Sequence, residues 1–279
     1  MIRTFILLAA TGLAAPALAQ AAPSPDELAH QDSLTIGVGG AMIPDYEGSD
    51  DYRLIPAAAI RGQVSGISFS TKGTYLYVDV IPRGSSKLEF DAGPIVGIRA
   101  NRTRHHLKDD IVDLLPRRKT AIEVGGFAGI SYHGLTNPYD SLYLQLDVVH
   151  DVGKAHRSTT FSPELSFSTP LSHTTYVSAS LGAEFISNKF ADYYFSITPA
   201  DSLATGGGLP VFNAGGGMKD WKAGLLVNQS LTGDLTHGLS AFGTARYARL
   251  LGDFKRSPIV SQRGSANQWV LAAGLAYTF

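Results

Sequence analysis

Cysteine is absent from this chain of 279 residues. Without cysteine no disulfide can form, so an exported chain of this kind must be held by a large core or by burial in a membrane. Long hydrophobic runs are also missing. After residue 19 no segment approaches the roughly 20 apolar residues that a membrane-spanning helix needs, which excludes insertion by helices.

Charge is scarce as well. Asp, Glu, Lys and Arg together make up 17% of the chain, and the formal net charge of −1 argues against a nucleic-acid partner. With 44% hydrophobic residues and a mean hydropathy near zero, the chain is neither disordered nor a helical membrane protein. Many of its 30 glycines lie inside alternating apolar runs. Glycines are unfavourable inside helices, but they suit the strands of a barrel with a crowded interior.

The first residues have the pattern of an export signal. Basic Arg3 precedes an apolar run over residues 5–15, and the small-residue site Ala17-Leu18-Ala19 follows. The run is too short to span a bilayer, so we interpret residues 1–19 as a cleaved signal peptide rather than an N-terminal anchor helix. Residues 20–32 read as a short periplasmic lead-in without a core of its own, and residues 33–279 as a single membrane-embedded domain.

The stretch from Gln268 to Phe279 indicates which kind of domain this is. Bulky residues alternate with small ones, and aromatic residues lie at both ends of the bulky face, at Trp269, Tyr277 and Phe279. A strand of this length, tilted by ~40°, rises ~25 Å, the height of the apolar band on an outer-membrane barrel. We therefore expect it to be the strand that closes a transmembrane β-barrel, with these three aromatic residues at the membrane interfaces.

Similar alternating runs fill the rest of the chain, most clearly over residues 141–148 and 177–185. One ambiguity lies at residues 65–81, which as a single strand give about eleven strands in total. A tight turn at Lys72-Gly73 splits this segment and gives about twelve, an even number as in bacterial single-chain barrels. The fold class expected is therefore an all-β, antiparallel transmembrane barrel. A lipocalin-like soluble barrel is the alternative, but it would require a polar exterior.

With this split, the connections between strands divide into a short set and a long set. Short ones are expected at Gln63–Ser65, Arg83–Ser86, Gly134–Pro138, Ser172–His173 and Thr232–His237. Longer ones are expected at Pro44–Tyr52, Asn101–Arg118, Gly153–Arg157, Ser187–Ala214 and Gly252–Ala266. This asymmetry is typical of barrels with short periplasmic turns and long extracellular loops.

The face assigned to the barrel lumen carries charges of both signs. They are Arg61, Asp79, Glu89, Asp91, Arg99, Glu123, Asp147, Glu164, Glu184, Lys222 and Arg246. Since unpaired charges are not stable in a dry interior, these residues must pair with one another or meet water. Pairing would plug the barrel, whereas a row of charges in contact with water would form a narrow pore that mildly favours cations. The sequence leaves both possibilities open.

Two other clusters contain residue types that could support chemistry. His105 and His106 with Asp109, Asp110 and Asp113 could bind zinc, but they lie among basic residues in what reads more simply as a solvated charged loop that contacts lipid phosphates. Asp147, His150 and Asp151 resemble the Asp/His machinery of a barrel hydrolase, but no serine or water site can be placed beside them. Gly206–Gly208 and Gly215–Gly217 indicate flexible loops. We predict no catalytic residue, metal or cofactor.

Three blocks resemble a known family. They are residues 43–56 (IPDYEGSDDYRLIP), residues 192–195 (DYYF) and the closing segment from Leu250 to Phe279. Together they are similar to the MipA/OmpV family, the MltA-interacting outer-membrane proteins, although Phe254-Lys255-Arg256 departs from the small and acidic residues expected there. Within the first block, Pro44, Tyr46, Gly48, Asp50 and Tyr52 are expected to form a structured loop that caps the lumen.

The resemblance implies an outer-membrane protein that acts as a scaffold between a murein lytic transglycosylase and a peptidoglycan synthase. We therefore expect a barrel in contact with outer-membrane lipid, without enzymatic chemistry, that serves as a scaffold or adaptor in envelope maintenance. A narrow small-solute channel is the alternative function, and a barrel hydrolase is the third.

Overall fold

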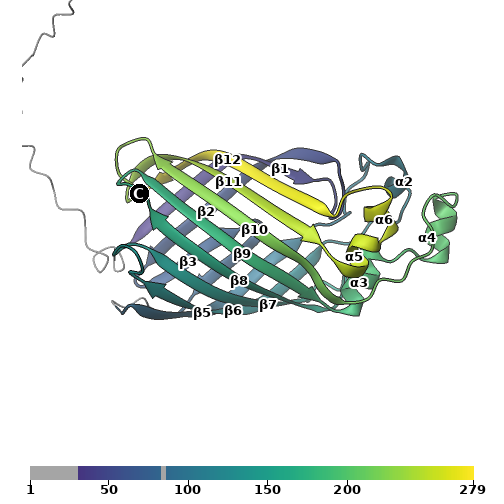
Figure 1. The fold of residues 1–279 in the computed structure, drawn as a ribbon, viewed down its shortest axis with the longest axis horizontal. Coiled ribbons are helices and arrows are strands. Elements are labelled where there is room, and N and C mark those ends of the chain that lie inside the picture. Colours follow the sequence, from purple (N-terminus) through teal and green to yellow (C-terminus); the bar gives the residue numbers. More distant parts are fainter. Residues whose placement is uncertain (1–30, 83–85) are drawn as a thin grey trace, which may run out of the picture.

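The chain forms one closed barrel (Figure 1). A computed structural model describes residues 31–82 and 86–279, so the predicted signal peptide and most of the predicted lead-in lie outside the described residues. Within them the strands are β1 Ser33–Pro44, β2 Tyr52–Val64, β3 Ile67–Lys72, β4 Tyr75–Asp79, β5 Leu88–Arg99, β6 Ala121–His133, β7 Ser141–Asp151, β8 Thr159–Pro170, β9 Thr175–Ile186, β10 Gly217–Ser230, β11 Gly238–Leu250 and β12 Asn267–Thr278.

Each strand pairs with its neighbours in sequence, and the antiparallel pairing of β1 with β12 closes the barrel. Val38 lies opposite Leu275 across this seam. The predicted split of residues 65–81 is confirmed: β3 and β4 are separate short strands, joined by a tight turn in which Gly73 has a φ of 61°. The barrel therefore has twelve strands in the described chain, the even number expected from the sequence.

The two faces of the wall differ as the alternation predicted. On β12, Trp269, Leu271, Leu275 and Tyr277 are exposed on the outside, while Gln268 and Ala276, on the opposite face of the strand, are buried. Exposed Val38, Leu54 and Phe90 continue the apolar outer surface around the barrel. Such a surface is stable in lipid but not in water, which excludes the soluble lipocalin-like alternative.

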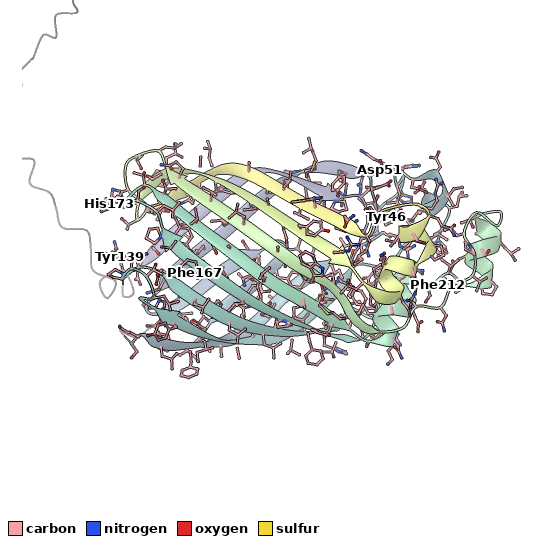
Figure 2. All side chains as sticks on the ribbon, in the orientation of Figure 1. Tyr46, Asp51, Tyr139, Phe167, His173 and Phe212 are labelled. Atoms are coloured by element: carbon pink, nitrogen blue, oxygen red, sulfur yellow. The ribbon has the colours of Figure 1, made fainter. Side chains whose placement is uncertain are left out.

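The two ends of the barrel are also unlike each other. Short turns join the strands at one end, whereas the loops at the other end carry the helices α2 Asp110–Asp113, α3 Asn188–Phe195, α4 Pro199–Ala204, α5 Gly252–Arg256 and α6 Pro258–Ser261 (Figure 1). Figure 2 shows Tyr139 and His173 at the end with the short turns, and Tyr46 and Phe212 at the opposite end. By this asymmetry the helical end is extracellular and the end with short turns is periplasmic. None of the helices in the described residues is long and apolar enough to cross a membrane.

Phe279 completes the seam at the periplasmic interface. Its backbone N–H donates to the carbonyl of Leu34 over 2.9 Å, and its exposed ring packs edge-on against Tyr277, with 4.7 Å between the ring centres. We predict that replacing Phe279 with Asp slows or prevents barrel assembly, because a charge is unfavourable at this apolar interface. Heat-modifiable migration on gels measures assembly, and migration identical to that of the unmodified protein would contradict the prediction.

Candidate functional site: the capped mouth of the barrel

Five loops close over the extracellular mouth, and we call them together the cap: residues 45–51, 100–120, 152–158, 187–216 and 251–266. The cap and the strand ends beneath it share a hydrophobic core, unusual for loops, which mostly lie exposed on the surface. Its buried residues are Tyr46, Val112, Leu115, Ile186, Phe190, Ala191, Tyr194, Phe195, Ile197, Leu209, Ala214, Leu250, Phe254, Ile259 and Val260. The cap is therefore a packed body rather than a set of free loops.

The first loop is clamped by the last. The Tyr46 hydroxyl is buried between two carbonyls of the loop after β11, those of Ile259 and Arg263, each 3.0 Å away. Burial raises the pKa of Tyr46, and the nearby carboxylates of Asp109 and Asp50 raise it further. This hydroxyl therefore stays a neutral hydrogen-bond donor.

Gly48 allows the first loop to lie this close to the loop after β11. Its φ is +101°, and a Cβ there would lie 2.4 Å from Cγ2 of Val260, so a larger residue fits neither the backbone nor the space. Its N–H donates to the side chain of Gln268 over 3.1 Å, and the same side chain donates back to the carbonyl of Ser49 over 3.0 Å. More than 200 residues apart in sequence, the first and closing blocks are hydrogen-bonded to each other.

The block at residues 192–195 lies in the centre of the cap. It forms the end of α3, where Tyr194 and Phe195 are fully buried. Ser257 donates to the carbonyl of Phe195 over 2.5 Å, and Arg102 donates to that of Tyr194 over 2.9 Å. All three sequence blocks therefore meet in one body, although the sequence separates them widely.

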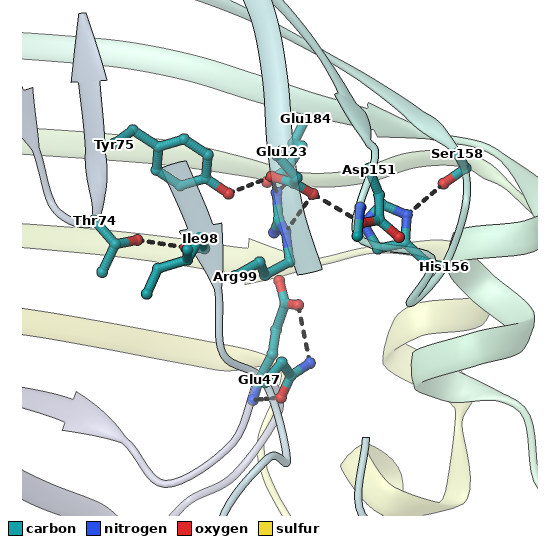
Figure 3. A network of polar contacts seen from close by, with 12 residues as sticks. Glu47, Thr74, Tyr75, Ile98, Arg99, Glu123, Asp151, His156, Ser158 and Glu184 are labelled. Carbon is teal, nitrogen blue, oxygen red and sulfur yellow. Dashed lines mark hydrogen bonds and ion pairs between the residues drawn. The ribbon is translucent and has the colours of Figure 1, made fainter. Parts of the chain in front are cut away.

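A layer of buried charges lies directly beneath the cap, and we call it the charged layer: Glu47, Arg99, Glu123, Glu184, Lys219, Asp220 and Lys222 (Figure 3 shows part of it). Arg99 bridges two strands, with its Nε 3.1 Å from Glu123 and its Nη2 3.0 Å from Glu184. Glu184 also receives Lys219 and Lys222, each at 2.8 Å. One carboxylate thus binds three cations, and the layer crosses from β5 and β6 to β9 and β10.

The charged layer is also joined to the cap. Lys219 forms an ion pair with Glu47 of the first loop, and its side chain is only 2% exposed. Above the layer, the ring of Phe190 on α3 faces Arg99 and Lys219, at 5.0 Å and 5.5 Å from its centre. Such cation–π contacts strengthen when water is excluded. Movement of the cap would therefore expose or unpair these charges.

One contact set resembles hydrolase machinery. The ring of His156 lies 2.9 Å from Glu123 and 2.7 Å from the hydroxyl of Ser158. However, Ser158 is buried, the His156 side chain is fully enclosed, and its ring packs against Phe190 and Tyr194. A nucleophile must reach its substrate, so this arrangement supports the loop rather than catalysis.

Further from the cap, one group of lumen charges is open to solvent. Glu164 lies 3.6 Å from both Lys72 and Arg246, and all three side chains are between 29% and 48% exposed. Tyr77 donates to Asp147 over 2.8 Å. Toward the periplasm, Asp79 accepts from the amide of Ile81, Asp91 accepts from Ser131, and Glu89 lies 3.3 Å from His133. Arg61 is exposed and makes no ion pair with the described residues.

A protein-family model, described as MltA-interacting protein MipA, matches residues 36–279. The chain belongs to this family. Its closed barrel with an apolar outer surface is accordingly that of an outer-membrane protein. No curated protein matches the sequence at a significant level.

Solved outer-membrane barrels are similar in outline only. An outer membrane channel from Pseudomonas putida F1 is 8% identical with a TM-score of 0.44, and the match covers 95% of this chain and all of that one. The CymD monoaromatic hydrocarbon channel is 10% identical with a TM-score of 0.40 and 90% coverage of each chain. A Pseudomonas aeruginosa FadL homologue is 9% identical with a TM-score of 0.37, covering 91% of this chain and 92% of that one.

In this MipA-family barrel the predicted lumen charges do not form one network. Arg99, Glu123, Glu184 and Lys222 come together in the charged layer, whereas Glu164 and Arg246 form a separate hydrated group with Lys72. Glu89, Asp91 and Asp147 each bind a polar neighbour elsewhere in the lumen. The lumen thus has a largely buried charged layer beneath the cap and, further along, a separate group of charges that is open to solvent.

Sequence reasoning missed several members of the site. Lys219 lies out of phase with the inward-facing Asp220 and Lys222, but a register shift between Met218 and Asp220 turns it into the barrel. Glu47 and His156 come from loops, where no alternation reveals which way a side chain points. The Gly215–Gly217 run, which ends on the first residue of β10, was the available signal, because a glycine within a strand often marks a bulge.

The remaining family-motif residues lie at different points around the first loop, and the other predicted clusters do not form sites. Pro44 ends β1, Asp50 is exposed, and the Tyr52 hydroxyl accepts from the backbone N–H of Trp269 over 3.2 Å. Asp147 and Asp151 face inward while His150 is exposed and contacts Thr159, so these three do not converge. In the described residues no group of three or more His, Asp or Glu side chains is arranged to hold a metal ion, and Asp109 caps α2 instead.

Breaking the charged layer should destabilise the barrel strongly. We predict that Glu123→Gln lowers the free energy of unfolding by about 3–5 kcal/mol, because Arg99 loses a buried partner. The matched change Glu164→Gln, in the hydrated group, should cost less than about 1 kcal/mol. Urea titration followed by circular dichroism measures both, and equal effects of the two variants would show that the layer is not dry.

Proposed function

We propose that this protein is a closed outer-membrane anchor that binds a murein lytic transglycosylase on its periplasmic side. The observation that carries the proposal is the packed cap over the extracellular mouth, joined to a dry layer of paired charges. A barrel closed in this way is suited to anchoring rather than to free passage of solutes. The family description, MltA-interacting protein, supplies the class of partner.

A murein enzyme can reach only the periplasmic end of the barrel. Three successive turns there each present an exposed leucine: Leu135 (48% exposed) after β6, Leu171 (66%) after β8 and Leu231 (55%) after β10. Their strands follow one another around the wall, so the three turns lie along one arc of the rim. Apolar residues on an exposed rim are a suitable docking surface for a protein partner.

The turn that carries Leu135 is held rigid. The Asp140 carboxylate accepts hydrogen bonds from the amides of Leu135, Thr136 and Asn137, at 2.7, 2.6 and 3.1 Å. Burial alone would raise the pKa of Asp140, but these hydrogen bonds lower it to about 2. Because the folded-state pKa is depressed, the carboxylate supports the turn above its ordinary pKa and loses this effect only as the pH falls toward 2. A turn ordered in advance lowers the entropy cost of binding.

A second partner, the peptidoglycan synthase implied by the family resemblance, would have to bind the same end. Residues 21–30 and 83–85, which we expected to offer periplasmic contacts, lie outside the described residues. The scaffold role thus places two murein enzymes beside one membrane anchor. No enzymatic chemistry is included in the proposal, because Ser158 and His156 are buried.

Replacing Leu135, Leu171 and Leu231 together with Ser should abolish co-purification of the lytic transglycosylase, because the exposed apolar contacts are lost. Leu203→Ser is the matched control: Leu203 is 80% exposed, but on α4 at the extracellular end. Both variants should keep heat-modifiable migration. Retention of the enzyme by the triple variant, or its loss from the control, would contradict the proposed docking rim.

A narrow channel is the second candidate, favoured by the hydrated group of Lys72, Glu164 and Arg246 in the lumen. In that case the cap would have to move aside for solutes to pass. We expect the unmodified protein to show little or no conductance in planar bilayers. A stable conductance, with no murein enzyme co-purifying, would overturn the anchor proposal in favour of the channel.

A further inference from the structure

The outer wall carries a compact aromatic cluster near the extracellular end. Trp221 of β10, Tyr247 of β11 and Trp269 of β12 lie side by side, with 5.3 Å and 5.0 Å between neighbouring ring centres. The chain contains only two tryptophans, and both are in this cluster. Amphipathic rings at this depth lie where lipid head groups meet acyl chains.

Arg249 lies on the same outward face, one step closer to the cap. It is directly opposite Trp221 on β10 and Asn267 on β12. Both Arg249, through Nη1 at 3.1 Å, and the Tyr247 hydroxyl, at 2.7 Å, donate to Oδ1 of Asn267. This shared acceptor holds the guanidinium beside the rings. Among the described residues Arg249 has no ion pair, so its charge is available to a ligand.

A second cation, Lys108, lies on the other side of the cluster. The Tyr52 side chain reaches the backbone N–H of Trp269, and the exposed Lys108 donates to the Tyr52 carbonyl over 2.6 Å. From β11 to β2 there are three strand spacings, so Arg249 and Tyr52 are separated by roughly 14 Å.

We propose that this surface, formed by Trp221, Tyr247, Arg249, Asn267 and Trp269, binds the phosphorylated glycolipid of the outer leaflet. Arg249 binds a head-group phosphate, for which its planar fork of donors is well shaped. The three rings pack against the sugar and the first part of the acyl chains. Lys108 attracts a second phosphate at the far end of the same head group. The site lies outside the barrel and does not depend on the proposed anchor function.

The two tryptophans make the site directly measurable, because all tryptophan emission comes from it. We would titrate the full barrel in detergent micelles with diphosphorylated lipid A and follow tryptophan fluorescence. The unmodified protein should show a saturable change in emission that the fully dephosphorylated lipid does not produce at the same concentrations.

The variant Arg249→Gln should bind the phosphorylated lipid about 5-fold more weakly, the effect expected for one basic residue near a lipid surface. The affinity of Arg249→Lys should lie between those of the unmodified protein and Arg249→Gln, because the charge remains but the planar fork of donors is lost. Arg61→Gln is the matched control, since it removes the same charge from the lumen side and should bind like the unmodified protein. Heat-modifiable migration confirms that each variant is folded.

Two results would overturn the proposal. The first is an equal response to phosphorylated and dephosphorylated lipid, which would mean that the cluster is an ordinary aromatic belt. The second is an equal loss of binding in Arg249→Gln and Arg61→Gln, which would mean that overall charge, and not this site, attracts the lipid.

Discussion

The structure depends on the pairing of Glu184 with Arg99, Lys219 and Lys222. Charges buried this deeply are tolerated only while their partners stay in place, and removing one partner costs far more than the pair itself contributes. Glu123 and Glu47 complete the arrangement from β6 and from the first loop. Because Glu47 belongs to the cap, the cap cannot leave the mouth without breaking a buried ion pair. Electrostatics in the wall therefore fixes the position of the loops.

The same constraint gives the barrel two different ends. Toward the cell exterior, the hydrophobic core of the cap and the charged layer exclude water. Toward the periplasm, Glu164 and its partners Lys72 and Arg246 remain partly exposed. A barrel whose lumen is closed at the extracellular end and open to solvent toward the periplasm is well suited to a role on the periplasmic side. The proposed murein enzymes act on that side. The outer wall meanwhile provides contact with lipid.

Much of the fold could be predicted because the two-residue alternation of side chains holds along most of the strands. On β12 the bulky residues from Trp269 to Tyr277 face outward as the alternation predicted, and the even strand count correctly placed a turn near Gly73. The site was less predictable. A bulge reverses the direction of Lys219, and Glu47 and His156 lie in loops whose paths follow from tertiary packing. The contact between Tyr46 and Ile259 spans most of the sequence, and no local pattern reveals it.

Closure of the extracellular mouth is the central claim, and accessibility of the lumen tests it most directly. Since the chain has no cysteine, Arg246→Cys places a single thiol in the hydrated lumen beneath the cap. On intact cells a membrane-impermeant thiol reagent too large to pass a packed loop body should leave this cysteine unlabelled. After the outer membrane is permeabilised, the reagent should enter from the periplasmic end and label it. Equal labelling rates in intact and permeabilised cells would show that the mouth is open, and would contradict the account.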